Sequence, residues 1–280
     1  MSRSVAPTMS AILAGCLLAA CTTEPVRSDS MAVAAPAVSG SAIPVSRPIS
    51  EQIPSNPTTR SAKAHTELGM AYMRSARNGV AMDEARIAIK ADAGYAPAHL
   101  LMGMVYALQE QPELGRPYFE EAVRLAPGDP EINTAYGWFL CSQGKEADGL
   151  RRIEAAARNP YFTTPGNAWM SAGMCLLRMR DYPAAEDRFQ RAAQSDAKNT
   201  EALIALAETL YMQDKLPRAK HWLDQAMKRV ARQPPGVLWL AIRIERKLGN
   251  QSLMQVFASR LQQDYPNSNE AMLYREGKFE

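Results

Sequence analysis

This sequence of 280 residues lacks the residue patterns that mark most enzyme active sites. It contains only three histidines, His65, His99 and His221, which stand far apart and have no neighbour at metal-ligand spacing. Gly-x-Ser-x-Gly elbows and Gly-rich phosphate loops are also absent. We therefore expect a protein that is not an enzyme and that requires neither a metal ion nor a cofactor.

Charge of one sign and closely spaced cysteines are lacking as well. The formal net charge is only +3, and acidic and basic residues alternate along the chain instead of gathering on a basic face. A protein that follows a phosphate backbone needs such a face, so nucleic acid is not an expected partner. The four cysteines show no Cys-x-x-Cys spacing, which argues against zinc and thioredoxin-like sites.

The first 20 residues resemble a bacterial export signal. Arg3 is their one charged residue, and the apolar run 9–20 is too short to span a bilayer. The run ends Leu-Ala-Ala before Cys21, which resembles a lipobox and implies a lipid-modified Cys21 as the first mature residue. Cys16 also follows a matching tripeptide, but it would leave a shorter apolar stretch, and ordinary signal cleavage is a further alternative.

The segment behind the lipobox differs from the rest of the chain. It is rich in Pro, Ser, Ala and Thr and has no hydrophobic periodicity, so we predict a disordered tether over residues 21–61. Lipoproteins retained in the inner membrane carry Asp after the modified cysteine, whereas Thr22 stands here. The predicted location is therefore the outer membrane, with a lipid anchor and the protein facing the periplasm.

The remaining chain, residues 62–280, is self-similar. A bulky residue precedes a small one at six places, and four of the five intervals between the small residues are 34 residues long, with one of 36. The small residues are Gly69, Gly103, Gly137, Gly173, Ala207 and Ala241. A period of 34 residues is that of tetratricopeptide helical hairpins.

A second set of positions supports this interpretation. Twelve residues after each of the first five small residues another small one occurs, and four residues later most repeats carry a large apolar residue such as Phe119 or Ile153. Helices approach closely only where side chains are small, and bulky neighbours fill the gaps. We predict an all-α fold, an α-α superhelix (solenoid) of six tetratricopeptide repeats with a short C-terminal tail.

Longer motifs in the repeats resemble one family. They are Tyr136-Gly-Trp-Phe-Leu-Cys141-Ser-Gln-Gly144, Asn159-Pro-Tyr, Ala172-Gly-Met-Cys175, Leu238-Trp-Leu-Ala-Ile-Arg243 and Tyr265-Pro-Asn-Ser268. With the lipobox, they resemble the PilF/PilW type IV pilus biogenesis and stability family. The resemblance implies a pilotin, a lipoprotein that binds the secretin subunit and promotes its outer-membrane localisation and multimerisation. We expect a monomer. Another periplasmic adaptor for outer-membrane or cell-wall assembly is the alternative.

Side chains at fixed positions of each first helix line the concave face of such a solenoid, which suits a peptide or helix of a partner. In the first two repeats these positions are apolar and rich in methionine, whose thioether adapts to irregular surfaces. The predicted partner-binding residues are Met70, Met73, Leu100 and Met104, with Trp138 of the third repeat as a further candidate. Packing inside the repeats is the competing role for all of them.

Cys141 and Cys175 fall on the first helices of adjacent repeats, which stack side by side. A disulfide between them is plausible in the oxidising periplasm. Two free buried thiols remain the alternative, because the sequence does not give the separation of the two Cα atoms.

Overall fold

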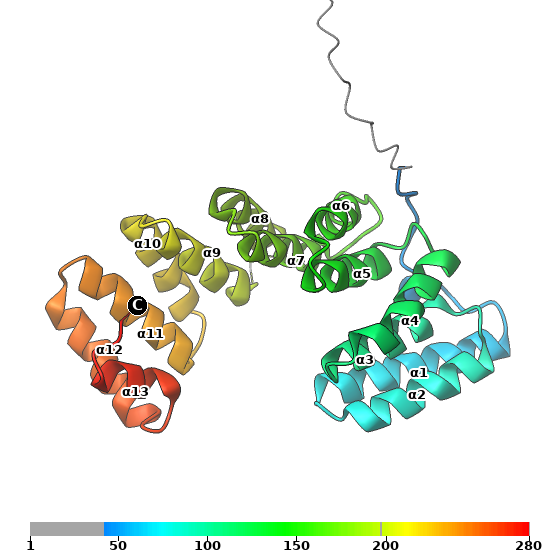
Figure 1. Cartoon of the computed structure of the whole chain (residues 1–280), viewed down its shortest axis with the longest axis horizontal. Coiled ribbons are helices and arrows are strands. Elements are labelled where there is room, and N and C mark those ends of the chain that lie inside the picture. Colours follow the sequence, from blue (N-terminus) through cyan, green and yellow to red (C-terminus); the bar gives the residue numbers. More distant parts are fainter. Residues whose placement is uncertain (1–41, 197, 280) are drawn as a thin grey trace, which may run out of the picture. The chain divides into compact units, whose positions relative to one another are not determined.

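The computed structural model describes residues 42–196 and 198–279. These residues form thirteen α-helices and one short 3-10 helix, Ile49–Glu51, and no strand (Figure 1). Twelve helices pair into six hairpins, which are α1 Pro57–Arg74 with α2 Asn78–Ala91, α3 Ala96–Leu108 with α4 Pro112–Leu125, α5 Pro130–Ser142 with α6 Glu146–Ala157, α7 Pro165–Arg178 with α8 Tyr182–Ser195, α9 Thr200–Met212 with α10 Leu216–Met227, and α11 Pro235–Lys247 with α12 Gln251–Asp264. The all-α fold of six repeats is confirmed.

Local sequence signals explain where these helices begin and turn. Most of the twelve have Pro in their first turn, where its missing N–H costs no hydrogen bond. Asn56 caps α1 by accepting from the Thr59 N–H at 2.7 Å, and Asp181 caps α8 in the same way. Every hairpin turn contains one residue with positive φ. They are Ala76, Glu110, Gly144, Arg180, Asp214 and Gly249.

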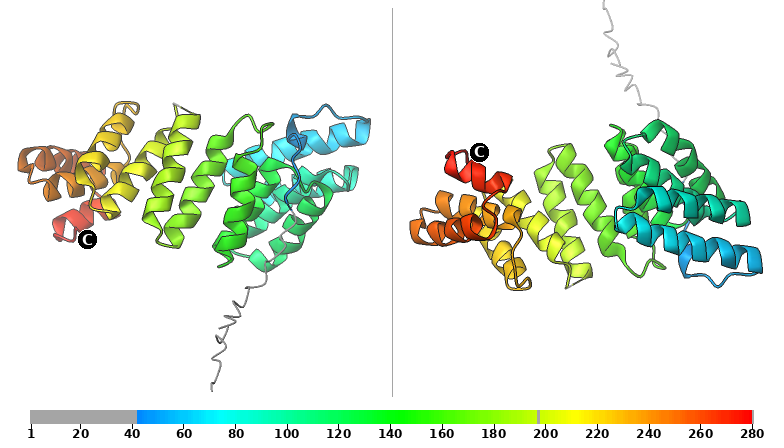
Figure 2. Two further views of the ribbon diagram at one scale, coloured as in Figure 1. Left: turned by 90° about the horizontal axis from the view of Figure 1, so that it is seen from above. Right: turned by 90° about the horizontal axis from the view of Figure 1, so that it is seen from below.

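Small residues allow the paired helices to approach closely. A Cβ added to Gly137 would lie 2.6 Å from Ile153 Cγ1 and 2.7 Å from the Gly149 carbonyl oxygen, so α5 and α6 cross at backbone contact. Gly173 similarly receives the Phe189 ring of α8. Each second helix also contacts the first helix of the next repeat, and the helices stand side by side along residues 42–279 (Figure 2).

The C-terminal tail packs on the last repeat. Helix α13, Asn269–Arg275, contacts α11 and α12, and its Ala271 is fully buried. The ring of Phe279 stacks on that of Trp239, with ring centroids 5.5 Å apart. The Arg246 guanidinium lies 4.1 Å from the centroid of the same Phe279 ring. The tail thus covers apolar surface that a seventh repeat would otherwise bury.

The structure differs from the sequence-based expectation at the N-terminal edge of the repeats. Helix α1 begins at Pro57, five residues before the predicted start of the repeat domain, because Asn56 caps it. Residues 44–52, expected to belong to the disordered tether, contain a short 3-10 helix and bond to the loops between repeats. Their hydrogen bonds come from residues distant in sequence, which a composition-based prediction does not detect.

None of the helices in the described ranges combines the length and the apolar character needed to cross a bilayer. The predicted signal peptide and both candidate anchors, Cys21 and Cys16, lie outside the described residues.

Candidate partner-binding groove

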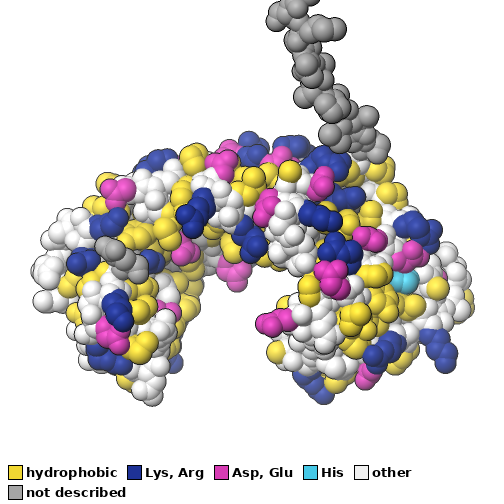
Figure 3. Space-filling model, in the orientation of Figure 1, with side chains coloured by type: hydrophobic (Ala, Val, Ile, Leu, Met, Phe, Trp, Pro, Cys, Tyr) yellow, Lys and Arg dark blue, Asp and Glu magenta, His cyan; other side chains and the backbone are white. Residues whose placement is uncertain are grey.

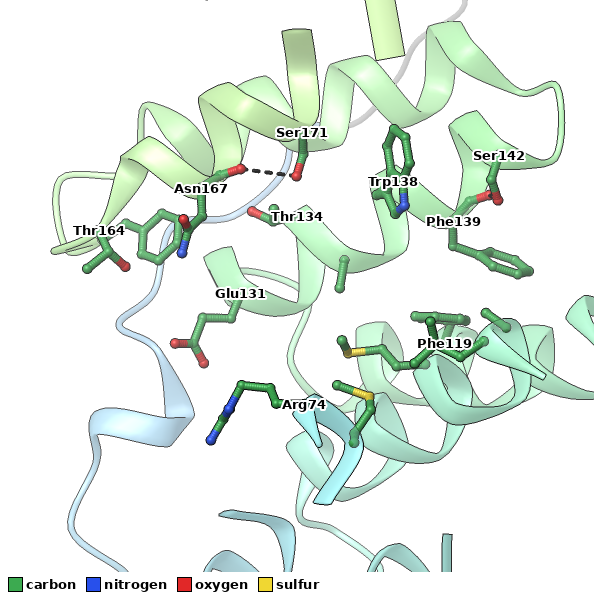
Figure 4. A pocket seen from close by; sticks show the side chains of 16 residues that line it. Arg74, Phe119, Glu131, Thr134, Trp138, Phe139, Ser142, Thr164, Asn167 and Ser171 are labelled. Atoms are coloured by element: carbon green, nitrogen blue, oxygen red, sulfur yellow. Dashed lines mark hydrogen bonds between the residues drawn. The ribbon is translucent and has the colours of Figure 1, made fainter. Parts of the chain in front are cut away.

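A cavity of about 700 Å³ opens between the first helices of repeats one to four (Figure 4). Helices α1, α3, α5 and α7 line it, together with Phe119 of α4 and the loop before α7. We call this cavity the groove. Its lining residues are Met73, Arg74, Met104, Ala107, Leu108, Phe119, Glu131, Thr134, Ala135, Trp138, Phe139, Ser142, Phe162, Thr164, Asn167 and Ser171.

The floor of the groove is apolar and aromatic. Phe119 and Phe139 stack with ring centroids 4.5 Å apart, and both are buried. Met73 and Met104 lie half-buried beside them, while Trp138 is 37% exposed. Hydrophobic side chains also gather on the surface over α3 and α4, with charged side chains around them (Figure 3). An apolar floor with an exposed tryptophan is typical of a site that anchors a hydrophobic side chain of a partner.

Polar groups occupy one end of the groove. In Figure 4 the charged ends of Arg74 and Glu131 point to the same side of the cavity. Burial raises the pKa of Glu131, and the nearby carboxylates of Asp129 and Glu51 add to this effect, while a hydrogen bond from Ser50 opposes it. On α7, Ser171 donates a hydrogen bond to the Asn167 carbonyl oxygen (Figure 4). These groups offer both charge signs and hydrogen-bonding sites to a bound segment.

The groove contains three of the five residues predicted to bind a partner, Met73, Met104 and Trp138. The other two do not line it. Leu100 is only 5% exposed and belongs to the core of repeats two and three, and Met70 is half-buried against the same core. The repeat positions that define the concave face therefore do not by themselves predict which side chains line the groove. Some of these positions on the first helices pack against neighbouring helices instead.

Several lining residues escaped the sequence reasoning. Leu108 is exposed at the end of α3, one position beyond the pattern, and Phe139 follows Trp138 directly. Thr164 comes from the longer loop that the 36-residue interval indicates. Of these residues, only Thr164 had a signal in the sequence, namely the longer interval. Whether Leu108 and Phe139 face the groove depends on how their helices are rotated about their axes.

A disulfide between Cys141 and Cys175 joins two of the helices that line the groove, and the Cα atoms of the two cysteines lie 5.7 Å apart. Both side chains are fully buried, so the bond joins α5 to α7 inside the core. Of the two alternatives that the sequence allowed, the structure contains the bonded one.

The three histidines make ordinary structural contacts. His65 Nδ1 lies 2.6 Å from Glu84 Oε2, His99 Nε2 lies 2.9 Å from the Ala93 carbonyl oxygen, and His221 contacts Gln225. Within the part of the chain that the structure describes, no group of three or more His, Cys, Asp or Glu side chains could hold a metal ion.

Comparison with known proteins agrees with this architecture. Tetratricopeptide-repeat family models match residues 66–130 and 176–236. The type IV pilus assembly protein PilF of Pseudomonas aeruginosa is 20% identical over 207 residues, which cover 74% of this chain and 82% of PilF.

Solved structures point the same way. A structure of Pseudomonas aeruginosa PilF matches with a TM-score of 0.68 and 19% identity over 80% of this chain and all of that one. PilW, described as a widely conserved type IV pilus biogenesis factor, matches with a TM-score of 0.70 and 26% identity over 76% of this chain and 97% of its own. The chain is a tetratricopeptide-repeat protein that is similar to PilF and PilW along most of its length.

Proposed function

We propose that this protein serves type IV pilus biogenesis as a pilotin, a lipid-anchored adaptor of the outer membrane that faces the periplasm. In this role it binds the secretin subunit and promotes its localisation and multimerisation. The general role is supported by the similarity to PilF and PilW along most of the chain. The observation that carries the binding role is the groove, with its apolar floor and its exposed Trp138.

The dimensions and chemistry of the groove suit a peptide segment or a helix better than a small polar substrate. Aromatic and thioether side chains of three repeats meet there, and such surfaces bind amphipathic segments through a few apolar anchors. Charged groups stand at one end and can fix the direction of the segment. An adaptor that binds through this surface needs no catalytic group.

A genetic experiment tests the cellular role. We expect that deletion of the gene, or Cys21→Ser, depletes secretin multimers from the outer membrane. Normal ring assembly and surface piliation in both strains would contradict the pilotin role. Loss of an unrelated outer-membrane assembly with intact secretin rings would instead favour the alternative of another periplasmic adaptor.

A biochemical experiment tests the groove itself. We expect Met73→Glu combined with Met104→Glu to weaken capture of the secretin subunit at least about tenfold, because two charges would enter the apolar floor. Met272→Glu is the matched control, since Met272 is exposed on α13, outside the residues that line the groove. Circular dichroism verifies that all variants stay helical. Equal capture by both variants would place the partner elsewhere.

A further inference from the structure

Residues 44–52 run across the repeats as a segment with its own binding seat, and we call this segment the strap. The Ser46 N–H donates to the Gly128 carbonyl oxygen at 3.2 Å, and the Ile49 N–H donates to Asp129 Oδ2 at 2.7 Å. Asn159 Nδ2 donates to the Ser46 carbonyl oxygen at 2.8 Å. The strap therefore bonds to the loop between repeats two and three and to the loop between repeats three and four.

The seat is built from buried groups. Asp129 is 1% exposed and uses both oxygens, one for the strap and one for the N–H groups of Glu131 and Ile132 at the start of α5. Gly128 passes so close to the strap that a Cβ there would lie 2.9 Å from the Pro44 carbonyl oxygen. Loops that hold a polypeptide by both backbone and side chain in this way resemble a peptide-binding site.

Side chains of the strap also contribute apolar contacts. Ile49 packs against two core clusters, one formed by the first and second repeats and one that continues into the third. The Arg47 guanidinium lies 5.3 Å over the Tyr161 ring. Lys63 of α1 donates to the Ser50 carbonyl oxygen at 2.6 Å, which ties the first repeat to the same segment. The strap thus contacts repeats one to three and the loop that leads into repeat four, and all of these border the groove.

The strap ends at the polar end of the groove. Glu131, which lines the groove, lies close enough to the strap residues Ser50 and Glu51 that both affect its pKa. Thr163, next to the lining residue Thr164, donates to Glu51 Oε1 at 2.9 Å. Release of the strap would therefore change the surroundings of Glu131 and free the loop that carries Thr164.

We propose that residues 44–52 bind in cis as a strap that holds repeats one to three and the loop before repeat four in one arrangement and keeps the polar end of the groove in its binding form. Partner capture then depends on a segment that belongs to no repeat. The dependence of capture on the strap rests on the proposed function, whereas the seating of the strap does not.

Amide hydrogen exchange, measured by NMR on the mature chain, tests the seating. We expect the amides of Ser46 and Ile49 to exchange at least about tenfold more slowly than that of Ile53, whose side chain is 94% exposed. The variant Asp129→Asn isolates the strap bond. Its carbonyl oxygen still caps α5, but its NH₂ group faces the Ile49 N–H, so the protection of Ile49 is lost while that of Ile132 stays. Equal exchange of Ser46, Ile49 and Ile53 in the wild-type chain would overturn the seating.

A pair of strap variants tests the coupling to the groove. Ile49→Asp removes the apolar contact, and Ile53→Asp is the matched control with the same added charge. With the secretin subunit as the probe, we expect Ile49→Asp to weaken capture at least about fivefold and Ile53→Asp to leave it unchanged, a difference of about 1 kcal/mol. If the amide of residue 49 lost its protection against exchange in Ile49→Asp while capture of the secretin subunit stayed unchanged, the coupling would be overturned. Failure of the wild-type chain to capture secretin would instead contradict the proposed function, and the exchange rates would still decide the seating.

Discussion

Cys141 and Cys175 are joined by a disulfide that links the first helix of the third repeat to the first helix of the fourth. The bond closes a loop between residues 34 apart, and its sulfur atoms lie in the fully buried core. In a solenoid each repeat contacts only its neighbours, so a single inter-repeat bond restrains the unfolded chain across that interface. The groove extends over the same two repeats.

Replacing both cysteines by serine should therefore lower the free energy of unfolding by about 2–4 kcal/mol. Urea unfolding of the oxidised wild-type protein and of Cys141→Ser/Cys175→Ser measures the difference. Dithiothreitol is the control, because it should lower the stability of the wild type toward that of the variant and leave the variant unchanged. Equal stability of the two oxidised proteins would contradict the prediction.

Gly149→Ala should destabilise the third repeat. The added Cβ would lie 2.6 Å from Cys141 Sγ and 3.0 Å from the Cys141 nitrogen, so α5 and α6 must separate, at a cost of about 1–3 kcal/mol. Gly79→Ala is the matched control. Apart from the neighbouring backbone of its own helix, no atom lies within 4 Å of the Cβ added there, and alanine in a helix should raise stability by about 0.5–1 kcal/mol. Thermal unfolding shows whether each variant is less or more stable than the wild type. A loss of stability of similar size in both variants would refute the packing argument.

Two tryptophans should separate binding from stability. Trp138 is exposed in the groove, so Trp138→Ala should weaken capture of the secretin subunit about tenfold or more while changing the unfolding free energy by less than about 1 kcal/mol. Trp169 is buried, with the Arg191 guanidinium 5.2 Å above its ring, and Trp169→Ala should lose about 3–5 kcal/mol. For each variant, a binding titration with the secretin subunit measures capture, and urea unfolding measures the free energy of unfolding. If Trp138→Ala destabilised the fold as Trp169→Ala does, Trp138 would be a packing residue.

The stability of the junction between repeats four and five should depend on pH through Glu186. Burial alone would raise the pKa of Glu186, but hydrogen bonds from Lys215, Gln213 and Arg218 outweigh burial and hold the pKa below its usual value. A carboxyl group with a lowered folded-state pKa stabilises the fold above its unfolded-state pKa, and this contribution is lost as the pH falls through the folded-state value.

Glu186→Gln should therefore be less stable than the wild type near neutral pH, by about 1–2 kcal/mol, since two charged donors lose their carboxylate. The difference should shrink as the pH falls below the usual pKa of a glutamate, about 4.3, because the wild-type carboxylate then becomes protonated. Urea unfolding at a series of pH values measures it. A gap that stays constant over this range would show that Glu186 acts by shape and not by charge.

The repeat architecture could be predicted because its signals are local and periodic. Gly137 and Gly149 mark a helix crossing whose contact residues lie close together in sequence, and the same spacing of small residues recurs in four further hairpins. The helix starts follow equally local signals, such as the cap at Asn56. Such signals survive without knowledge of the rest of the chain.

The groove could be predicted only in part. The sequence placed Met73, Met104 and Trp138 on one face, but it also placed Leu100 there, which the structure buries. The position of a residue within the repeat indicates only how such residues are exposed on average. The rotation of each helix and the size of the neighbouring side chains decide how far a particular side chain is exposed. Leu108 became a lining residue for the same reason.

By itself, the sequence determined the six-repeat helical architecture, the absence of recognisable catalytic motifs and the residues able to form a disulfide, since these depend on residue type and spacing along the chain. Only the tertiary structure decided which methionines reach the groove, that Cys141 meets Cys175, and that residues 44–52 bind as a strap. These depend on contacts such as that of Ser46 with Asn159, which join residues 113 positions apart. No local pattern encodes such contacts, because burial and hydrogen bonding there come from loops that only the stacked repeats bring together.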